Sequence, residues 1–158
     1  MYKILVTGFE PFAGLKTNVS GIVASSLDSK CFNVDIGERA IGSRGVRQRN
    51  PRLTWSSEIL TVDSDGSRRI SDAIMSDSIN EIDAIIHLGL ARDASIPRIE
   101  SRGLNSNCFL SPDNQGRIVN GEIIIGAPSE IPVSVSLESI QRENLKYSFE
   151  FSNDAGGF

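Results

Sequence analysis

The chain is poor in the residues that build metal and redox sites. Among its 158 residues are two cysteines, Cys31 and Cys108, and a single histidine, His87. Neither cysteine stands at the spacing of a metal ligand, so a zinc site built from Cys and His is not expected. Two cysteines without a partner motif are typical of free thiols in a reducing compartment. The sequence therefore predicts no bound metal and no cofactor.

Long apolar runs and an excess of positive charge are also absent. No stretch approaches the roughly 20 residues that span a bilayer, and the short apolar block at 2–6 leads into Thr-Gly rather than a cleavage site. The net charge is −4, whereas nucleic acid needs a clustered basic surface. The arginines at 44–52 are expected to lie in a solvated loop. We expect a cytoplasmic protein that binds neither membrane nor nucleic acid.

The composition and the order of apolar segments predict one α/β domain over residues 1–158. Hydrophobic residues make up 39% and charged residues 23% of the chain, as in ordinary globular domains. Apolar runs at 2–7 and 83–90 are typical of buried parallel strands, which we expect to be adjacent and central. Helical spacing over 18–29 and 66–79 places helices between strands. This alternation predicts a three-layer sandwich with a mostly parallel central sheet.

The remaining segments carry weaker patterns. The first predicted helix would begin at Asn18 and carry Ile22, Val23 and Leu27 on one face. Strong turn residues occupy 112–116. We further expect a helix at 133–145 and short strands at 32–36, 58–62, 96–100, 121–125 and 146–152.

The loop after the first strand is the most informative segment. It reads Gly8-Phe9-Glu10-Pro11-Phe12-Ala13-Gly14. Apolar side chains normally lie in the core, so two phenylalanines in a loop with Gly and Pro suggest a small, flat, apolar pocket. Packing of both rings beneath the loop is the alternative. Bulky Phe and the lack of a Lys-Ser/Thr pair argue against a phosphate-binding loop.

Three further segments accompany this loop: Ile86-His87-Leu88-Gly89-Leu90-Ala91, Ile99-Glu100-Ser101-Arg102-Gly103-Leu104-Asn105 and Ser152-Asn153-Asp154-Ala155-Gly156-Gly157-Phe158. Together the four segments resemble pyroglutamyl peptidase I, the cysteine exopeptidase (pyrrolidone-carboxylate peptidase) that removes an N-terminal pyroglutamate. The resemblance spans residues 3 to 158 and is weakest over 33–62. It implies a phosphorylase/hydrolase-like fold and, as partner, a peptide with an N-terminal pyroglutamate.

The resemblance also implies roles for single residues. Phe9 and Phe12 would flank the uncharged lactam ring of the substrate. Asn18 matches the Asn that follows the loop in the family, although Val19 stands where Pro is usual. Glu100 matches the acidic member of a Cys-His-Glu triad, where it would accept a hydrogen bond from the imidazole. A solvated carboxylate at a strand end is the alternative for Glu100.

The chain departs from the family at several positions. Leu110 stands where the family usually has Arg, and Arg92-Asp93-Ala94 stands where a Gly-Arg pair is common. Cys31 and Cys108 match nothing catalytic, and His87 is expected to be a hydrogen-bonded core histidine. In the family the Cys-Asn of the nucleophile comes just after the segment that ends here at Phe158.

We therefore expect a pyroglutamyl-peptidase-like domain that is incomplete at its C-terminus and lacks the nucleophile and the catalytic histidine. The 158 residues by themselves should then be inactive as a thiol protease. Two alternatives remain open: a non-catalytic binding or scaffold protein that keeps the pocket, and a hydrolase of different specificity. A homo-oligomer that buries an uncovered sheet face is also open.

Overall fold

The computed structural model describes residues 1–34, 51–143 and 147–154. These fall into two compact units, Met1–Leu90 and Ala91–Phe158, and each is described by itself. Most of the arginine-rich run, residues 35–36 of the strand expected at 32–36, and residues 155–158 lie outside the described residues. No helix in the described ranges is long and apolar enough to cross a membrane.

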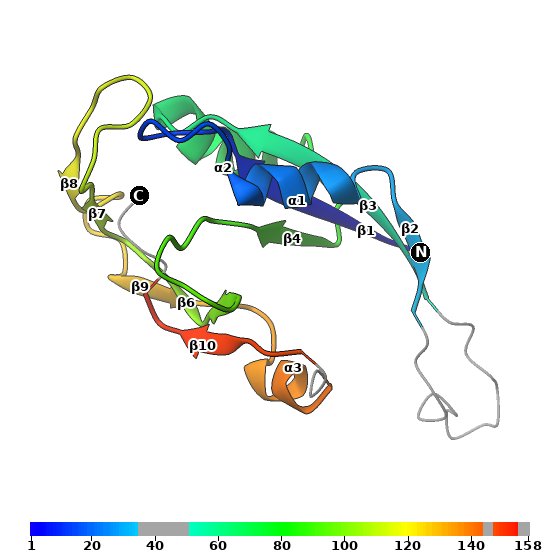
Figure 1. The fold of residues 1–158 in the computed structure, drawn as a ribbon. Coiled ribbons are helices and arrows are strands. Elements are labelled where there is room, and N and C mark those ends of the chain that lie inside the picture. The colour runs from blue at the N-terminus through cyan, green and yellow to red at the C-terminus, as the bar shows by residue number, and fades with distance from the viewer. Residues whose placement is uncertain (35–50, 144–146, 155–158) are drawn as a thin grey trace, which may run out of the picture. The chain divides into compact units, whose positions relative to one another are not determined.

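The N-terminal unit is built on a four-stranded sheet with the order β2-β3-β1-β4 (Figure 1). Its strands are β1 (Tyr2–Phe9), β2 (Cys31–Asn33), β3 (Arg52–Leu60) and β4 (Ala84–His87). β1 pairs in parallel with both β3 and β4, and only β2 runs antiparallel, against β3. The mostly parallel sheet and the adjacency of the two long apolar runs are confirmed.

Two helices pack on opposite faces of this sheet. Leu5 points to one face, where it packs with Leu60 and with Ile70 of α2 (Ser64–Met75). Gly8 is three residues further along β1 and so points to the other face. There a side chain would overlap the backbone of Ser20 in α1 (Val19–Leu27). The unit therefore has the helix-sheet-helix layering expected from the sequence.

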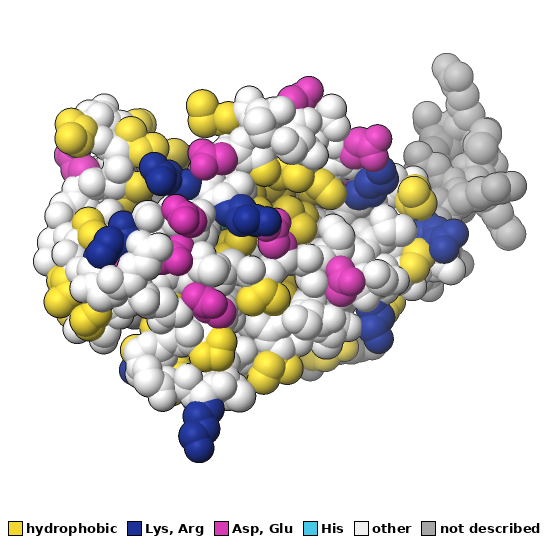
Figure 2. Space-filling model, turned by 90° about the horizontal axis from the view of Figure 1, so that it is seen from above, with side chains coloured by type: hydrophobic (Ala, Val, Ile, Leu, Met, Phe, Trp, Pro, Cys, Tyr) yellow, Lys and Arg dark blue, Asp and Glu magenta, His cyan; other side chains and the backbone are white. Residues whose placement is uncertain are grey.

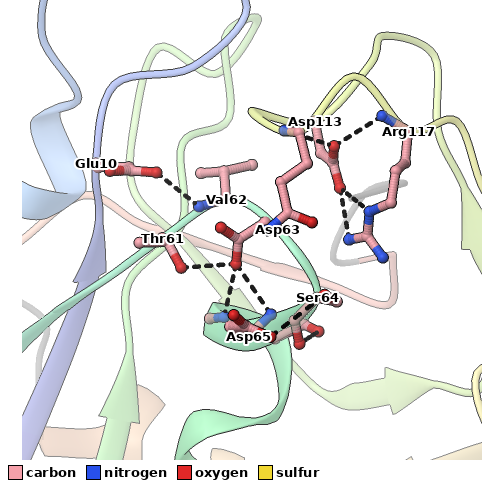
Figure 3. A network of polar contacts seen from close by, with 11 residues as sticks. Glu10, Thr61, Val62, Asp63, Ser64, Asp65, Asp113 and Arg117 are labelled. Atoms are coloured by element: carbon pink, nitrogen blue, oxygen red, sulfur yellow. Dashed lines mark hydrogen bonds and ion pairs between the residues drawn. The ribbon is translucent and has the colours of Figure 1, made fainter.

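The helices begin at capping side chains. Asn18 is the N-cap of α1, as predicted, and Asp63 is the N-cap of α2. One Asp63 carboxylate oxygen accepts hydrogen bonds from the backbone N–H groups of Asp65 and Gly66, both at 2.9 Å, and from the Thr61 hydroxyl at 2.7 Å (Figure 3). These bonds satisfy N–H groups that the first turn leaves open. They explain why α2 begins two residues before the predicted position.

The face that α1 turns to the sheet differs from the one the apolar spacing suggests. Its buried residues are Ser20, Gly21 and Ala24, whereas Ile22 and Val23 are 58% and 41% exposed. Small residues let the helix backbone lie close to β1, so the larger apolar side chains point outward. Figure 2 shows hydrophobic side chains at the surface among acidic and basic ones.

The expectation that the second apolar run forms a central strand is wrong for the described sheet. β4 is its edge strand, with β1 as its only described partner. Ile86 is 41% exposed, whereas Val6 of β1 is fully buried. Apolar content predicts that a segment forms a strand, but the number of its partners depends on residues far away in the sequence.

The C-terminal unit consists of short paired strands and one helix. β5 (Arg98–Glu100) pairs in parallel with β10 (Glu150–Ser152), while β6 (Arg102–Leu104) pairs with β9 (Glu130–Pro132) and β7 (Asn107–Cys108) with β8 (Asn120–Gly121), both antiparallel. The expected helix is α3 (Leu137–Glu143) within the described residues. The predicted strand at 121–125 is wrong beyond Gly121, because Ile123, Ile124 and Ile125 lie in exposed turns.

Asp113 organises the predicted turn between β7 and β8. One of its carboxylate oxygens accepts the backbone N–H groups of Gln115 and Arg117, both at 2.9 Å, and the other accepts the Arg117 guanidinium at 2.6 and 2.8 Å (Figure 3). Burial alone would raise the pKa of Asp113, but the hydrogen bonds from Arg117 and Gln115 and the charge of Arg117 outweigh it. The net effect lowers the pKa.

We expect the turn to lose stability in acid. A lowered native pKa means that the unfolded chain takes up the proton first, at about pH 3.9. The contribution of Asp113 is therefore complete above that pH and is lost as the pH falls through the lower native value. Urea unfolding at pH 6 and pH 3 should show a smaller acid loss for Asp113→Asn than for the unaltered chain. Asp72→Asn, at an exposed position of α2, is the control, and an equal loss in all three would contradict the prediction.

Gly66 provides a second test, of the packing of α2 on β3. A side chain there would overlap the carbonyl oxygen of Thr61, whereas Gly89 has nothing within 4 Å. We expect Gly66→Ala to lower the free energy of unfolding by about 1–3 kcal/mol, since a backbone oxygen cannot yield as a side chain can. Gly89→Ala should change it by less than about 0.5 kcal/mol. Urea unfolding compares the two, and equal stabilities would show that α2 can shift without cost.

Candidate functional site

The chain connections place a topological switch point at the carboxyl ends of β1 and β4. From β1 the chain reaches β3 through α1 on one face, and from β3 it reaches β4 through α2 on the other. β3 and β4 thus flank β1 with connections on opposite faces. In open α/β sheets ligands bind at such a switch point, outside the carboxyl ends of the strands. The loop that begins at Glu10 emerges there.

The pairing of β1 with β4 stops short of the end of β1. Leu88 donates its N–H to the carbonyl of Thr7 at 2.9 Å, and Glu10 donates to Leu60 of β3 at 3.0 Å. The N–H of Phe9 points to the β4 side, but it donates to the hydroxyl of Ser20 at 3.1 Å instead of to a strand. The two strands therefore separate at the point where the loop begins.

Asn18 holds this loop from inside the protein. It is 3% exposed, and its side-chain oxygen accepts the N–H of Ser20 at 3.1 Å and the Ser20 hydroxyl at 2.8 Å. Its amide nitrogen donates to the carbonyl of Glu10 at 3.1 Å. These contacts are internal, so the geometry shows Asn18 organising the loop. Direct contact with a ligand stays a prediction.

Phe9 and Phe12 have different surroundings. Phe9 packs against the core residues Leu5, Leu60 and Ile70, and it lines a cavity of about 280 Å³ together with Ile74 and His87. Phe12 is only 8% exposed and does not line that cavity. Phe9 thus borders a cavity, whereas Phe12 is packed within the loop.

His87 lies at the end of β4, in register with Thr7 of β1. Its Nδ1 is 2.7 Å from the Thr7 hydroxyl, and Thr7 is fully buried. Partial burial of the ring lowers the pKa of His87. The hydrogen bond agrees with the expectation, but the expected core position is wrong, because His87 is exposed at the end of the edge strand. Its imidazole lies on the wall of the cavity.

Glu10 links the loop to the start of α2. Its Oε1 accepts the backbone N–H of Val62 at 3.1 Å (Figure 3). The loop is therefore fixed from two sides, by Asn18 and Ser20 of the α1 turn and by the segment between β3 and α2. Sequence reasoning missed Ser20 and Glu10. The only signal for Ser20 was its position two residues after a capping Asn.

Glu100 lies in the C-terminal unit, as the last residue of β5. It faces Ser152 of β10 in the strand register. Its Oε2 is buried and has no hydrogen-bond partner among the described residues. The neighbouring cation is already engaged, because Arg98 is paired with Glu150 at 2.6 Å and with Asp93 at 3.5 Å. A buried polar atom without a partner is rare in native proteins and calls for an explanation.

The segment after Glu100 is held firmly in place. Arg102 pairs with Glu130 and donates to the carbonyl of Asn153 at 2.9 Å. Asn105 exchanges two 2.8 Å hydrogen bonds with the backbone of Ile124. Both residues fix the path of the chain around Glu100. By contrast, Leu110, the departure noted in the sequence, is 89% exposed.

Comparison with known proteins supports the resemblance noted in the sequence. No family model matches the chain. The pyrrolidone-carboxylate peptidase of Pyrococcus furiosus is 29% identical over an alignment of 161 positions, which covers 98% of this chain and 66% of that protein. Solved structures of pyrrolidone carboxyl peptidase from P. furiosus, one of a mutant enzyme, match with TM-scores of 0.75 and 0.73 at 27% identity, over 99% of this chain and 67% of theirs. Over nearly its whole length the chain is thus similar to pyrrolidone-carboxylate peptidase.

This similarity supports the family assignment made from the sequence, and the solved structures agree with the α/β fold. The chain spans 66% of the length of the curated pyrrolidone-carboxylate peptidase. The roles of Phe9, Phe12, Asn18 and Glu100 stay predictions, because similarity of fold does not assign single residues.

The cost of the unpartnered Glu100 oxygen can be measured. Since none of the described residues donates a hydrogen bond to Oε2, Glu100→Gln should leave the free energy of unfolding unchanged or raise it by up to about 1 kcal/mol. Glu130→Gln is the matched control, because it removes the partner of Arg102 and should lower stability by up to about 1 kcal/mol. Urea midpoints compare them. A clear loss for Glu100→Gln would show that the carboxylate stabilises the fold.

Proposed function

We propose that this chain binds peptides with an N-terminal pyroglutamate and carries the ring-binding and acidic parts of a cysteine peptidase site. The observation that carries the proposal is the buried Oε2 of Glu100, for which no described residue is a hydrogen-bond partner. Leaving such an atom unpaired costs about 1–3 kcal/mol, and more when it is charged. A cost of this kind is typical of a group kept for chemistry rather than for stability.

The role proposed for Glu100 follows from its free lone pairs. A triad carboxylate accepts the N–H of the catalytic histidine, fixes its tautomer and stabilises the imidazolium that forms when the histidine takes the proton of the nucleophile. An acceptor for this purpose must not be occupied by another donor. His87 is an unsuitable partner, because its Nδ1 already bonds to Thr7.

Binding of the ring is assigned to the N-terminal unit. A pyroglutamyl group is a five-membered lactam without charge, so an apolar wall with few polar groups suits it. Phe9 supplies such a wall in the cavity between α2 and the ends of β1, β3 and β4, and the imidazole of His87, whose pKa is lowered by partial burial, lines the same cavity. An open-chain N-terminal glutamate would carry an ammonium and a carboxylate into this apolar surrounding, at a high desolvation cost.

The chemical step needs a thiolate nucleophile and a histidine base. Neither Cys31 nor Cys108 corresponds to the family nucleophile, and both are exposed free thiols. We therefore propose that the 158 residues bind the substrate without cleaving it. Two free thiols also favour the reducing cytoplasm as the compartment.

Binding and turnover are tested separately. NMR titration of the chain with pyroglutamyl-alanine should give saturable shifts, and glutamyl-alanine should give none. Phe9→Ala should weaken binding about tenfold, because it removes the aromatic wall of the cavity. Phe32→Ala is the matched control, since Phe32 packs on Trp55 of β3, outside the cavity. A fluorogenic pyroglutamyl amide should not be turned over.

Each result has a defined reading. Turnover that stops on thiol alkylation would show that these residues hold a complete peptidase site. Equal binding of both dipeptides would favour a protein of different specificity. Absence of binding to either would overturn the proposal.

A further inference from the structure

We infer that Ser20 is a positioning residue of the ring-binding site, because its hydroxyl fixes the backbone of Phe9 and thereby the place of the Phe9 ring. The inference deepens the proposed function and rests on it. Ser20 is not expected to touch the ligand, since it is 3% exposed and points to the end of β1 from the first turn of α1.

The N–H of Phe9 requires a partner that the sheet does not provide. In a parallel ladder alternate residues of a strand bond to opposite neighbours. Thr7 bonds to β4 and Glu10 to β3, so the N–H of Phe9 faces the β4 side after that pairing has ended. The Ser20 hydroxyl oxygen replaces the missing strand acceptor and lies 3.1 Å from the Phe9 nitrogen. Without it, this N–H would be left open inside the protein.

The Ser20 hydroxyl is the middle member of a relay. It accepts from the Phe9 N–H and donates to the side-chain oxygen of Asn18 at 2.8 Å, while the Asn18 amide donates to the carbonyl of Glu10. The amide of Phe9 and the carbonyl of the next residue are thus both tied to the start of α1. A group that accepts and donates at once is needed there, which a hydroxyl supplies and a methyl group does not.

Close contact between α1 and β1 fixes the distance that the hydrogen bonds of Ser20 have to span. A side chain at Gly8 would overlap the carbonyl of Ser20, and a Cβ at Gly21 would lie 2.5 Å from the carbonyl oxygen of Phe9. The helix can approach no closer, and the short serine side chain spans the remaining gap. The Phe9 ring is therefore held at one depth on the cavity wall, which would favour one ring size.

Helix capping does not account for the hydroxyl. The N-cap bond of α1 runs from the backbone N–H of Ser20 to Asn18, and Ser20→Ala keeps it. The substitution removes only the two bonds of the hydroxyl. Loss of the hydroxyl should thus affect Phe9 more than the helix.

The test uses the 158-residue chain and two lactams, 2-pyrrolidone with a five-membered ring and 2-piperidone with a six-membered ring. Dissociation constants come from NMR titration, and hydrogen exchange of the Phe9 amide is followed in the same samples. We expect Ser20→Ala to weaken 2-pyrrolidone binding by about five- to tenfold, to reduce the preference over 2-piperidone and to speed exchange at Phe9. Ser20→Thr should restore all three. Ser26→Ala, on the last turn of α1 with its hydroxyl on the Val23 carbonyl, should change none.

The readouts separate the positioning role from a purely structural one. A lower melting temperature for Ser20→Ala with an unchanged ratio of the two lactam affinities would overturn the inference, as would unchanged exchange at Phe9. If the unaltered chain binds neither lactam, the proposed function fails. Exchange at Phe9 then still decides whether Ser20 holds the loop: faster exchange in Ser20→Ala supports that part, and equal exchange overturns it.

Discussion

The close approach of α1 to the end of β1 is the contact on which the N-terminal unit depends. It is possible because Gly8 and Gly21 meet where larger residues would collide with backbone. The short distance brings the Ser20 hydroxyl within reach of Phe9 and places Asn18 beneath the loop. The close backbone packing thus determines where the loop lies at the switch point. It thereby also determines which side chains line the cavity.

The parts of the fold that local signals specify were predictable from the sequence. β1 is a continuous apolar run, and Asn18 caps α1 because a short polar side chain can accept the open N–H groups of a first turn. The sheet-facing side of α1 was not predictable in this way. Apolar spacing points to Ile22 and Val23, but small residues face the sheet because the spacing between helix and sheet is short. That distance is a property of the packed pair, not of either segment.

The candidate site was predictable to a similar extent. The loop with Phe9 was found from residue type and position, and Glu100 from the resemblance to the family. The burial of Phe12 could not be read from the sequence. Ser20 and Glu10 act through single hydrogen bonds to backbone groups that are brought near by tertiary packing. Serine and glutamate are common at protein surfaces, so the presence of either residue type in the sequence does not indicate such a role. The unpartnered oxygen of Glu100 is likewise visible only after the surrounding chain is placed.

The pairing of β1 also has a consequence for the time course of biosynthesis. β1 is made before either of its neighbours, and the bond between Thr7 and His87 joins residues 80 positions apart. At roughly 5–20 residues per second, a ribosome needs about 4–16 s to add that stretch. Until β3 has been made both edges of β1 are open, and the edge that β4 covers stays open for the whole interval. α1 is the first element able to cover one of the faces of β1. A nascent chain of this length is therefore a natural client for chaperones that bind extended apolar segments.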